Sequence, residues 1–253
     1  MGSDFFGLDF RGPPFVLFSP AHLWPLAAIV AICFLVAAVT PRLGPRGREG
    51  LRWGLAAFAV ANWLGWDLWQ LSNGLWSVRY SLPLHLCTLA VPLAAIMLAT
   101  RSATLYQLLY FWGFAGATQA LLTPDLQAGG FNFPHFVYWI FWTSHGVILW
   151  AVVYAAAAWG YRPTWRSIAL AAVLTNLILA VVGVANWLTG GNYMFVARKP
   201  DYPTLLDYLG PWPWYIIPLQ LIGLAAFVLV YLPYAIRDAR SARSGDARSR
   251  SLG

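Results

Sequence analysis

The chain has 253 residues, of which 60% are hydrophobic and only 10% are charged. Soluble domains carry about 25% charged residues, so this composition excludes a soluble globular fold and indicates an integral membrane protein. The formal net charge of +7 does not indicate nucleic-acid binding, because the basic residues flank apolar runs or lie in a C-terminal tail, as the positive-inside rule predicts. We expect no nucleic-acid partner.

Apolar runs long enough to cross roughly 30 Å of hydrocarbon recur along the chain. They predict an all-α, polytopic membrane protein whose single domain, residues 23–236, is a bundle of seven transmembrane helices. Residues 1–22 form an N-terminal segment ahead of this domain. The tail 237–253 is rich in Ser, Ala, Arg and Gly and is predicted to be disordered, because it has too few apolar residues to pack. The predicted spans are 23–39, 51–70, 82–99, 103–122, 135–159, 165–188 and 212–236.

The basic residues are divided unequally between the two sides of these spans. Twelve of the 16 lie on one side. Because cytoplasmic loops are enriched in Lys and Arg, we expect an outside N-terminus and a cytoplasmic C-terminus in the cell membrane, with the basic tail near anionic lipid head groups. The larger group is Arg42, Arg46, Arg48, Arg52, Arg101, Arg162, Arg166, Arg237, Arg240, Arg243, Arg248 and Arg250; the smaller is Arg11, Arg79, Arg198 and Lys199.

Polar side chains within the apolar spans give the strongest indication of function, since such groups are costly in hydrocarbon and usually mark a functional site. At a rise of 1.5 Å per residue, most of them fall in the extracytoplasmic half of the bundle. We therefore predict a polar cavity that opens on that side. These residues are Asp67, Gln70, His85, Cys87, Gln119, His145, Asn176, Asn186 and Gln220.

The outer connection 189–211 is long for a compact bundle, and long connections are often lids or binding loops. Its candidate binding residues are Asn192, Tyr193, Asp207 and Tyr208. Aromatic residues at this depth also serve as interfacial anchors, and this alternative stays open.

Cys87 is the candidate nucleophile, because a thiolate attacks acyl carbon well once a base removes the proton. His145, on a different span, is the preferred base. His85 is two positions from Cys87, so on a regular helix the two side chains point about 200° apart. Pro83 permits an irregular first turn, which leaves His85 as a supporting residue or an alternative base.

Asp67 has two interpretations: an interfacial carboxylate that faces Arg79, or a third group that orients an imidazole. The amides of Gln119, Asn176 and Asn186 can donate hydrogen bonds to an oxyanion or a lipid ester, or can simply join helices. No spacing typical of metal ligands occurs, so we expect neither a metal nor another cofactor.

Several short motifs resemble those of YwaF-type bacterial integral membrane proteins, a group similar to the transmembrane protein 164 acyltransferase family. The motifs lie at residues 82–87, 123–125, 145–146, 191–194 and 205–214, and the resemblance extends from about residue 63 to residue 234. The resemblance implies a lipid acyltransferase related to membrane hydrolases of lipid esters. The family's proposed cysteine nucleophile and histidine match Cys87 and His145.

We therefore expect a transacylase that moves an acyl chain from a phospholipid to a lysophospholipid through a Cys87 thioester. An outward-facing site disfavours acyl-CoA, which is cytoplasmic. Two alternatives remain. The same pair can hydrolyse a lipid ester with water as acceptor, or the protein can be a non-enzymatic carrier or receptor that binds a small polar ligand through His85, Asp67 and the outer loop.

Overall fold

The computed structural model describes residues 5–126, 130–200 and 204–250, and within these ranges the chain is helical and has no strands. The all-α prediction is therefore confirmed for the described chain, and a helix or a continuous helical run coincides with each predicted span. The long elements are α2 (Pro20–Val39), α3 (Pro45–Ser72), α4 (Leu86–Thr100), α5 (Ala103–Phe111), η2 (Trp112–Ala117), α6 (Thr118–Leu122), α8 (Phe136–Trp159), α9 (Trp165–Thr189) and α10 (Ile216–Arg250). Short turns are η1 (Thr40–Arg42), η3 (Tyr193–Phe195) and η4 (Leu205–Leu209).

Among the described residues, four helices are long and apolar enough to cross a membrane. They are Pro20–Arg42, Phe136–Trp159, Trp165–Thr189 and Ile216–Ser241. α4 has only 15 residues, a length of roughly 22 Å at 1.5 Å per residue. The number of seven spans therefore stays a prediction.

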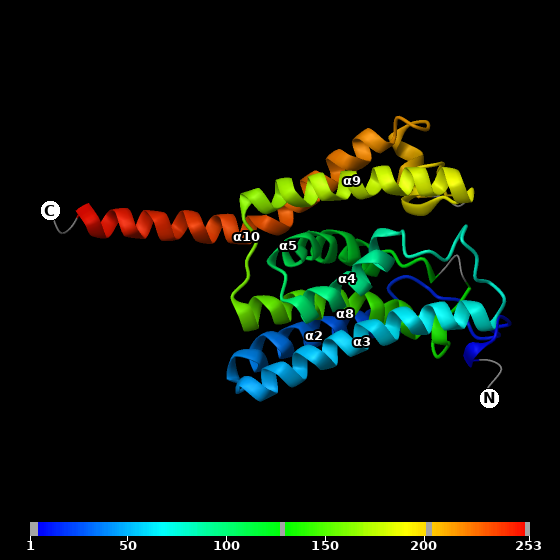
Figure 1. Ribbon diagram of the computed structural model, residues 1–253, viewed down its shortest axis with the longest axis horizontal. Coiled ribbons are helices and arrows are strands. Elements are labelled where there is room, and N and C mark those ends of the chain that lie inside the picture. Colours follow the sequence, from blue (N-terminus) through cyan, green and yellow to red (C-terminus); the bar gives the residue numbers. More distant parts are fainter. Residues whose placement is uncertain (1–4, 127–129, 201–203, 251–253) are drawn as a thin grey trace.

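The helices form two layers that run along a common direction (Figure 1). In the larger layer α3 packs against α4 and α8, α4 packs against α8, and α2 covers α8. In the other layer α9 and α10 lie together; α9 packs on α5 and α10 packs on η2. The core lies where α4, α5 and α8 meet, with Leu98, Leu109, Ile148 and Ala151 fully buried.

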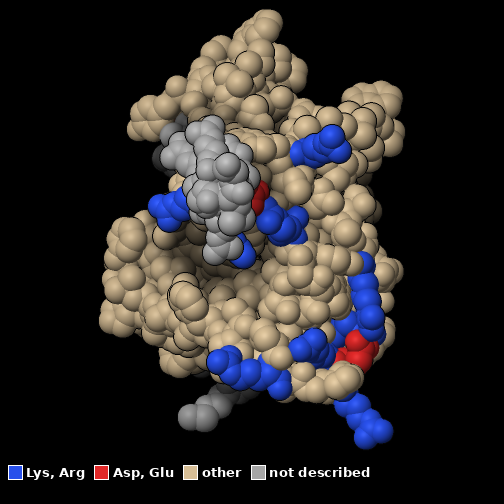
Figure 2. Space-filling model, turned by 90° about the vertical axis from the view of Figure 1, so that its left-hand side faces the viewer, with Lys and Arg blue, Asp and Glu red and all other residues tan. Residues whose placement is uncertain are grey.

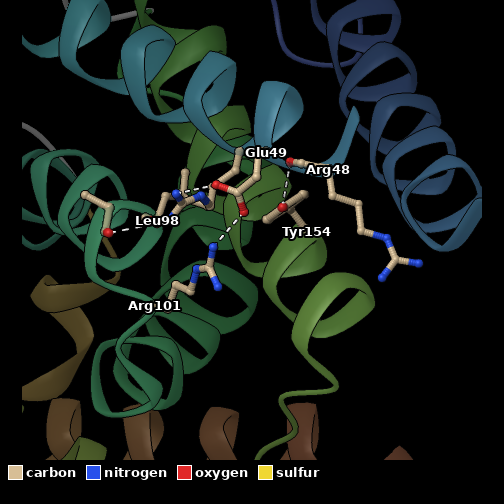
Figure 3. A network of polar contacts seen from close by, with 7 residues as sticks. Arg48, Glu49, Leu98, Arg101 and Tyr154 are labelled. Atoms are coloured by element: carbon tan, nitrogen blue, oxygen red, sulfur yellow. Dashed lines mark hydrogen bonds and ion pairs between the residues drawn. The ribbon is translucent and has the colours of Figure 1, made fainter. Parts of the chain in front are cut away.

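The connections that carry the larger group of arginines lie at one end of the bundle, where α10 projects from it (Figure 1). Figure 2 shows Lys and Arg side chains gathered at this end, which we call the arginine-rich end. Here Glu49 accepts hydrogen bonds from Arg52 at 2.5 Å and from Arg101 at 2.7 Å (Figure 3). Arg52 also donates to the carbonyl oxygen of Leu98 at 3.1 Å, and Tyr154 donates to a carbonyl near the start of α3 at 2.8 Å. This network joins α3, α4 and α8.

The N-terminal segment packs at the opposite end of the bundle. The indole N–H of Trp69 donates to the Phe6 carbonyl at 2.8 Å, and Nε2 of His135 donates to the Gly7 carbonyl at 2.8 Å. These contacts fix the last turns of α3 and the first turn of α8 to the segment that precedes α2.

Several boundaries differ from the prediction: α3 begins at Pro45 rather than at residue 51, and α10 begins at Ile216 rather than at residue 212. α4 begins at Leu86 rather than at residue 82, because His85 is an extended N-cap (φ −76°, ψ 148°) and Pro83 disfavours a helical residue before it. α10 continues as far as Arg250, through a segment predicted to be a disordered tail. Ala and Arg, which are frequent there, are strong helix formers.

Candidate functional site

A cavity of about 490 Å³ lies between α3, α4 and α8, and both Cys87 and His145 line it. The two residues come from different helices, α4 and α8. Most of the remaining wall is aromatic or aliphatic, and the connection before α8 contributes Asp125. The other lining residues are Asn62, Trp63, Trp66, Trp69, Leu75, Thr88, Val91, Leu126, Phe131, Val137, Ile140, Phe141 and Ser144.

The cavity lies in the half of the bundle that is away from the arginine-rich end. Its helical residues come from the second half of α3, the first turns of α4 and the first half of α8. α3 begins at the arginine-rich end, whereas α4 and α8 finish there. The cavity was predicted in the half of the bundle away from these arginines, and it lies there. The prediction was of a polar cavity, however, whereas the wall is mainly apolar and aromatic.

Cys87 is the second residue of α4 and is half-buried. The first N–H groups of a helix have no intrahelical acceptor, and the N-terminal turn favours negative charge. The next residue, Thr88, donates its hydroxyl to the His85 carbonyl at 3.0 Å, which closes this turn. The thiol therefore lies in the N-terminal turn of α4, beside backbone N–H groups that have no intrahelical acceptor.

His145 is 8% exposed, and its Nδ1 lies 2.7 Å from the carbonyl oxygen of Phe141. A carbonyl oxygen can only accept, so Nδ1 carries the proton in this contact. In the neutral ring, Nε2 then has a free lone pair and can take up a proton. In this tautomer Nε2 is the ring nitrogen that can act as a base.

Asp67 makes neither of the two contacts predicted for it. It is half-buried on α3 and does not line the cavity. The orienting partner of His145 is the Phe141 carbonyl, and no ion pair between Asp67 and Arg79 occurs among the described residues. In the same part of the chain, no group of three or more His, Cys, Asp or Glu side chains could hold a metal ion.

The three amides considered as oxyanion or lipid-ester donors do not line the cavity. Gln119 and Asn176 are exposed; Gln119 donates to Thr123 at 3.3 Å, and Asn176 donates to a carbonyl of its own helix at 2.9 Å. Asn186 is buried, but it exchanges two hydrogen bonds with the backbone of Tyr193, at 2.7 and 3.0 Å.

Tyr193 and His85 anchor the outer loop beside the start of α4. The Tyr193 hydroxyl donates to the Val78 carbonyl at 2.8 Å and accepts from the Leu82 N–H at 2.9 Å. Burial raises the pKa of the Tyr193 phenol, so the hydroxyl keeps the proton that it donates. Nδ1 of His85 accepts from the Met194 N–H at 3.3 Å, and its ring lies 5.4 Å from that of Tyr193. This cluster positions the chain directly before Cys87, and His85 does not line the cavity.

The other candidates in the loop hold its local conformation. Asn192 accepts from the Arg198 N–H at 3.0 Å and donates to the carbonyl of the same residue at 3.0 Å. Asp207 caps η4 by accepting from the Thr204 N–H at 2.8 Å. Tyr208 is 88% exposed. None of these three residues lines the cavity.

Asn62 is a cavity residue that the prediction did not include. It is 5% exposed, lies in the second half of α3 and lines the same cavity as Cys87 and His145. The signal was present, because Asn62 is an amide within an apolar span, which is the criterion that selected the other polar residues. Asp125, which belongs to the 123–125 motif, was likewise given no role.

The TMEM164 family model matches residues 17–231, which include α2 to α9, part of α10, and both Cys87 and His145. No curated protein and no solved structure matches the chain. The family match covers well over half of the sequence and every helix that lines the cavity. The chain therefore belongs to the TMEM164 family.

Proposed function

We propose that the protein is a membrane-embedded lipid acyltransferase in which Cys87 is the nucleophile and His145 is the base. The observation that carries this proposal is that the two side chains, from different helices, line one cavity. The Nδ1 contact of His145 leaves Nε2 as the proton acceptor. The apolar wall suits an acyl chain, and a volume of about 490 Å³ lies within the range of roughly 300–1,000 Å³ typical of ligand pockets.

In the first half-reaction, Nε2 of His145 takes the proton from the Cys87 thiol, and the sulfur attacks the ester carbonyl carbon of a phospholipid. A carbon–sulfur bond forms and the carbonyl becomes an oxyanion. When the oxyanion collapses, the bond between the carbonyl carbon and the glycerol oxygen breaks. That oxygen takes the proton from His145, and a lysophospholipid leaves.

The second half-reaction reverses these steps with another acceptor. The hydroxyl of a second lysophospholipid gives its proton to His145, and its oxygen attacks the thioester carbonyl. The carbon–sulfur bond breaks, the Cys87 sulfur takes the proton back, and a new diacyl lipid is released. Water in place of the second lysophospholipid gives a free fatty acid, so transfer and hydrolysis differ in one product.

The topology proposed with this function has seven spans in the cell membrane, an outside N-terminus and a cytoplasmic C-terminus. The arginine-rich end supports this orientation, because cytoplasmic loops are enriched in Lys and Arg. The cavity then faces the extracytoplasmic leaflet, where phospholipids and lysophospholipids are available and acyl-CoA is not. The basic C-terminal segment meets anionic lipid head groups on the cytoplasmic side.

The test uses purified protein in phosphatidylcholine vesicles that contain a phospholipid with a labelled acyl chain and an unlabelled lysophospholipid. We expect labelled diacyl product from the unmodified protein and from Cys33→Ser, since Cys33 packs against the core from α2 and does not line the cavity. We expect Cys87→Ala to abolish the product and His145→Ala to lower its rate about 10²–10⁴-fold.

The covalent step has its own readout. Mass spectrometry of the unmodified protein after a short reaction is expected to find the label on Cys87 as a hydroxylamine-sensitive thioester. Labelled free fatty acid as the main product would assign the site to a hydrolase. Undiminished transfer by Cys87→Ala would exclude the thioester route, and absence of any lipid product would favour a carrier.

A further inference from the structure

The wall beside Cys87 and His145 contains a buried amide whose orientation is fixed. Nδ2 of Asn62 donates to the carbonyl oxygen of Phe58 at 2.8 Å, and Oδ1 accepts from the Thr143 hydroxyl at 2.5 Å. The opposite amide orientation would place Oδ1 against a carbonyl oxygen, where neither atom can donate. The NH₂ group therefore faces Phe58, and one of its two N–H bonds serves that contact.

The second N–H bond of Asn62 is available to a ligand. Asn62 is 5% exposed and lines the cavity, so this donor lies in surroundings from which bulk water is largely excluded. In such surroundings a donor gains most from a charged acceptor. The same wall contains two hydroxyl groups, and both already donate to carbonyl oxygens at 3.0 Å: Thr88 donates to His85, and Ser144 donates to Phe141.

The first turn of α4 supplies further donors close to the sulfur. The N–H groups of a first turn have no intrahelical acceptor, and the N-cap His85 gives them no side-chain hydrogen bond. Cys87 is the second residue of this turn. Backbone N–H groups beside a nucleophile, together with one side-chain amide, are a recurrent way to stabilise the oxyanion of acyl transfer.

We infer that Asn62 is a catalytic residue that donates from Nδ2 to the oxyanion formed when Cys87 attacks the ester, together with the N–H groups at the start of α4. The inference rests on the proposed acyl transfer and adds a group to the same site. It also assigns to Asn62 the oxyanion role that was one of two alternatives for Gln119, Asn176 and Asn186, none of which lines the cavity. Thr143 is then a positioning residue: its single hydroxyl proton lies between Oδ1 and the Trp139 carbonyl, 2.8 Å away, and the Phe58 contact directs the NH₂ group.

The experiment compares two reactions of Cys87 that differ in their need for an oxyanion. Acyl transfer in phosphatidylcholine vesicles forms one, whereas alkylation of the thiol by iodoacetamide does not. The variants are Asn62→Leu and Asn62→Asp; the second keeps an acceptor for Thr143 and so preserves the helix–helix contact. The control is Gln107→Leu, which removes an amide from α5 outside the cavity.

We expect both Asn62 variants to lower kcat for acyl transfer about 10²–10³-fold, the usual effect of losing one oxyanion donor. In Asn62→Leu the alkylation rate of Cys87 should stay close to that of the unmodified protein, and Gln107→Leu should keep its kcat. An unchanged kcat in Asn62→Leu and Asn62→Asp would overturn the inference, and so would a parallel loss of alkylation, which indicates a structural role. If the unmodified protein never acylates Cys87, the proposed function itself fails, whatever Asn62 does.

Discussion

Replacement of Asn186 by Leu should release the outer loop from α9. Asn186 is 3% exposed, and its side chain makes both hydrogen bonds that fix the backbone of Tyr193. Leu has the same number of side-chain heavy atoms and the same branch point, so the substitution removes the two polar contacts and keeps the shape of the side chain. The N–H and the carbonyl of Tyr193 are then left without these partners in a buried position.

The magnitude follows from these two contacts. An unsatisfied buried donor or acceptor costs about 1–3 kcal/mol, and the gain from burying an apolar side chain offsets part of the total. We therefore expect Asn186→Leu to lower the free energy of unfolding by about 2–4 kcal/mol. The matched control is Asn176→Leu on the same helix, because Asn176 is exposed and donates to its own helix at 2.9 Å. That change should cost less than about 0.5 kcal/mol.

Thermal unfolding in detergent micelles gives the stability difference, and hydrogen exchange at the Tyr193 amide shows where it arises. Asn186→Leu should have a lower Tm and faster exchange at Tyr193, whereas Asn176→Leu should match the unmodified protein in both. Equal effects of the two substitutions would refute the reasoning, because the argument depends on the difference in burial and partners between Asn186 and Asn176.

Three further predictions concern stability, and the third compares two glycine substitutions. Glu49→Gln should lower the free energy of unfolding by about 1–3 kcal/mol, because it removes the charged partner of Arg52, whose side chain is 8% exposed. An unchanged Tm would show that the network in Figure 3 contributes little to stability. Tyr193→Phe removes a hydroxyl that donates one hydrogen bond and accepts another. It should lower the free energy of unfolding by about 1–3 kcal/mol, which would show as a lower Tm and an altered alkylation rate of Cys87. Values equal to those of the unmodified protein in both assays would contradict this. Gly183→Ala, where a Cβ meets nothing within 4 Å, should raise stability by up to about 1 kcal/mol. Gly146→Ala places a Cβ 2.8 Å from a tryptophan ring carbon and should be at least about 1 kcal/mol less stable than Gly183→Ala; equal Tm values would disprove the clash.

Hydropathy predicted the positions of the helices well, because each apolar run long enough to cross a bilayer coincides with a helix in the described chain. The start of α4 was missed by four residues, since the apolar run begins before Pro83 whereas the helix begins only after the extended residue His85. Hydropathy records the apolar run, but local backbone geometry determines where a helix starts.

It was harder to predict which polar residues line the cavity, as Asn62 and Asn176 show. Both are amides in apolar helices, yet Asn62 lines the cavity and Asn176 is exposed. In a membrane protein the lipid-facing surface is as apolar as the core, so the pattern of a helix does not reveal which face packs inward. Cys87 and His145 were selected by their chemistry and by the family resemblance, and the structure places both at one cavity.

The π-helical turn η2 determines where the run between α5 and the cavity can lose a residue. α5, η2 and α6 form a continuous run from Ala103 to Leu122, and the wide turn of Trp112–Ala117 holds one residue more than an α-helical turn. Loss of a single residue there would restore a regular α-helix and leave the helix that follows close to its present orientation, whereas loss of a residue from α5 or α6 would turn everything that follows by about 100°. Only the loss from α5 or α6 would carry the turn with Asp125 away from the cavity wall, so length differences between homologous chains should fall at η2.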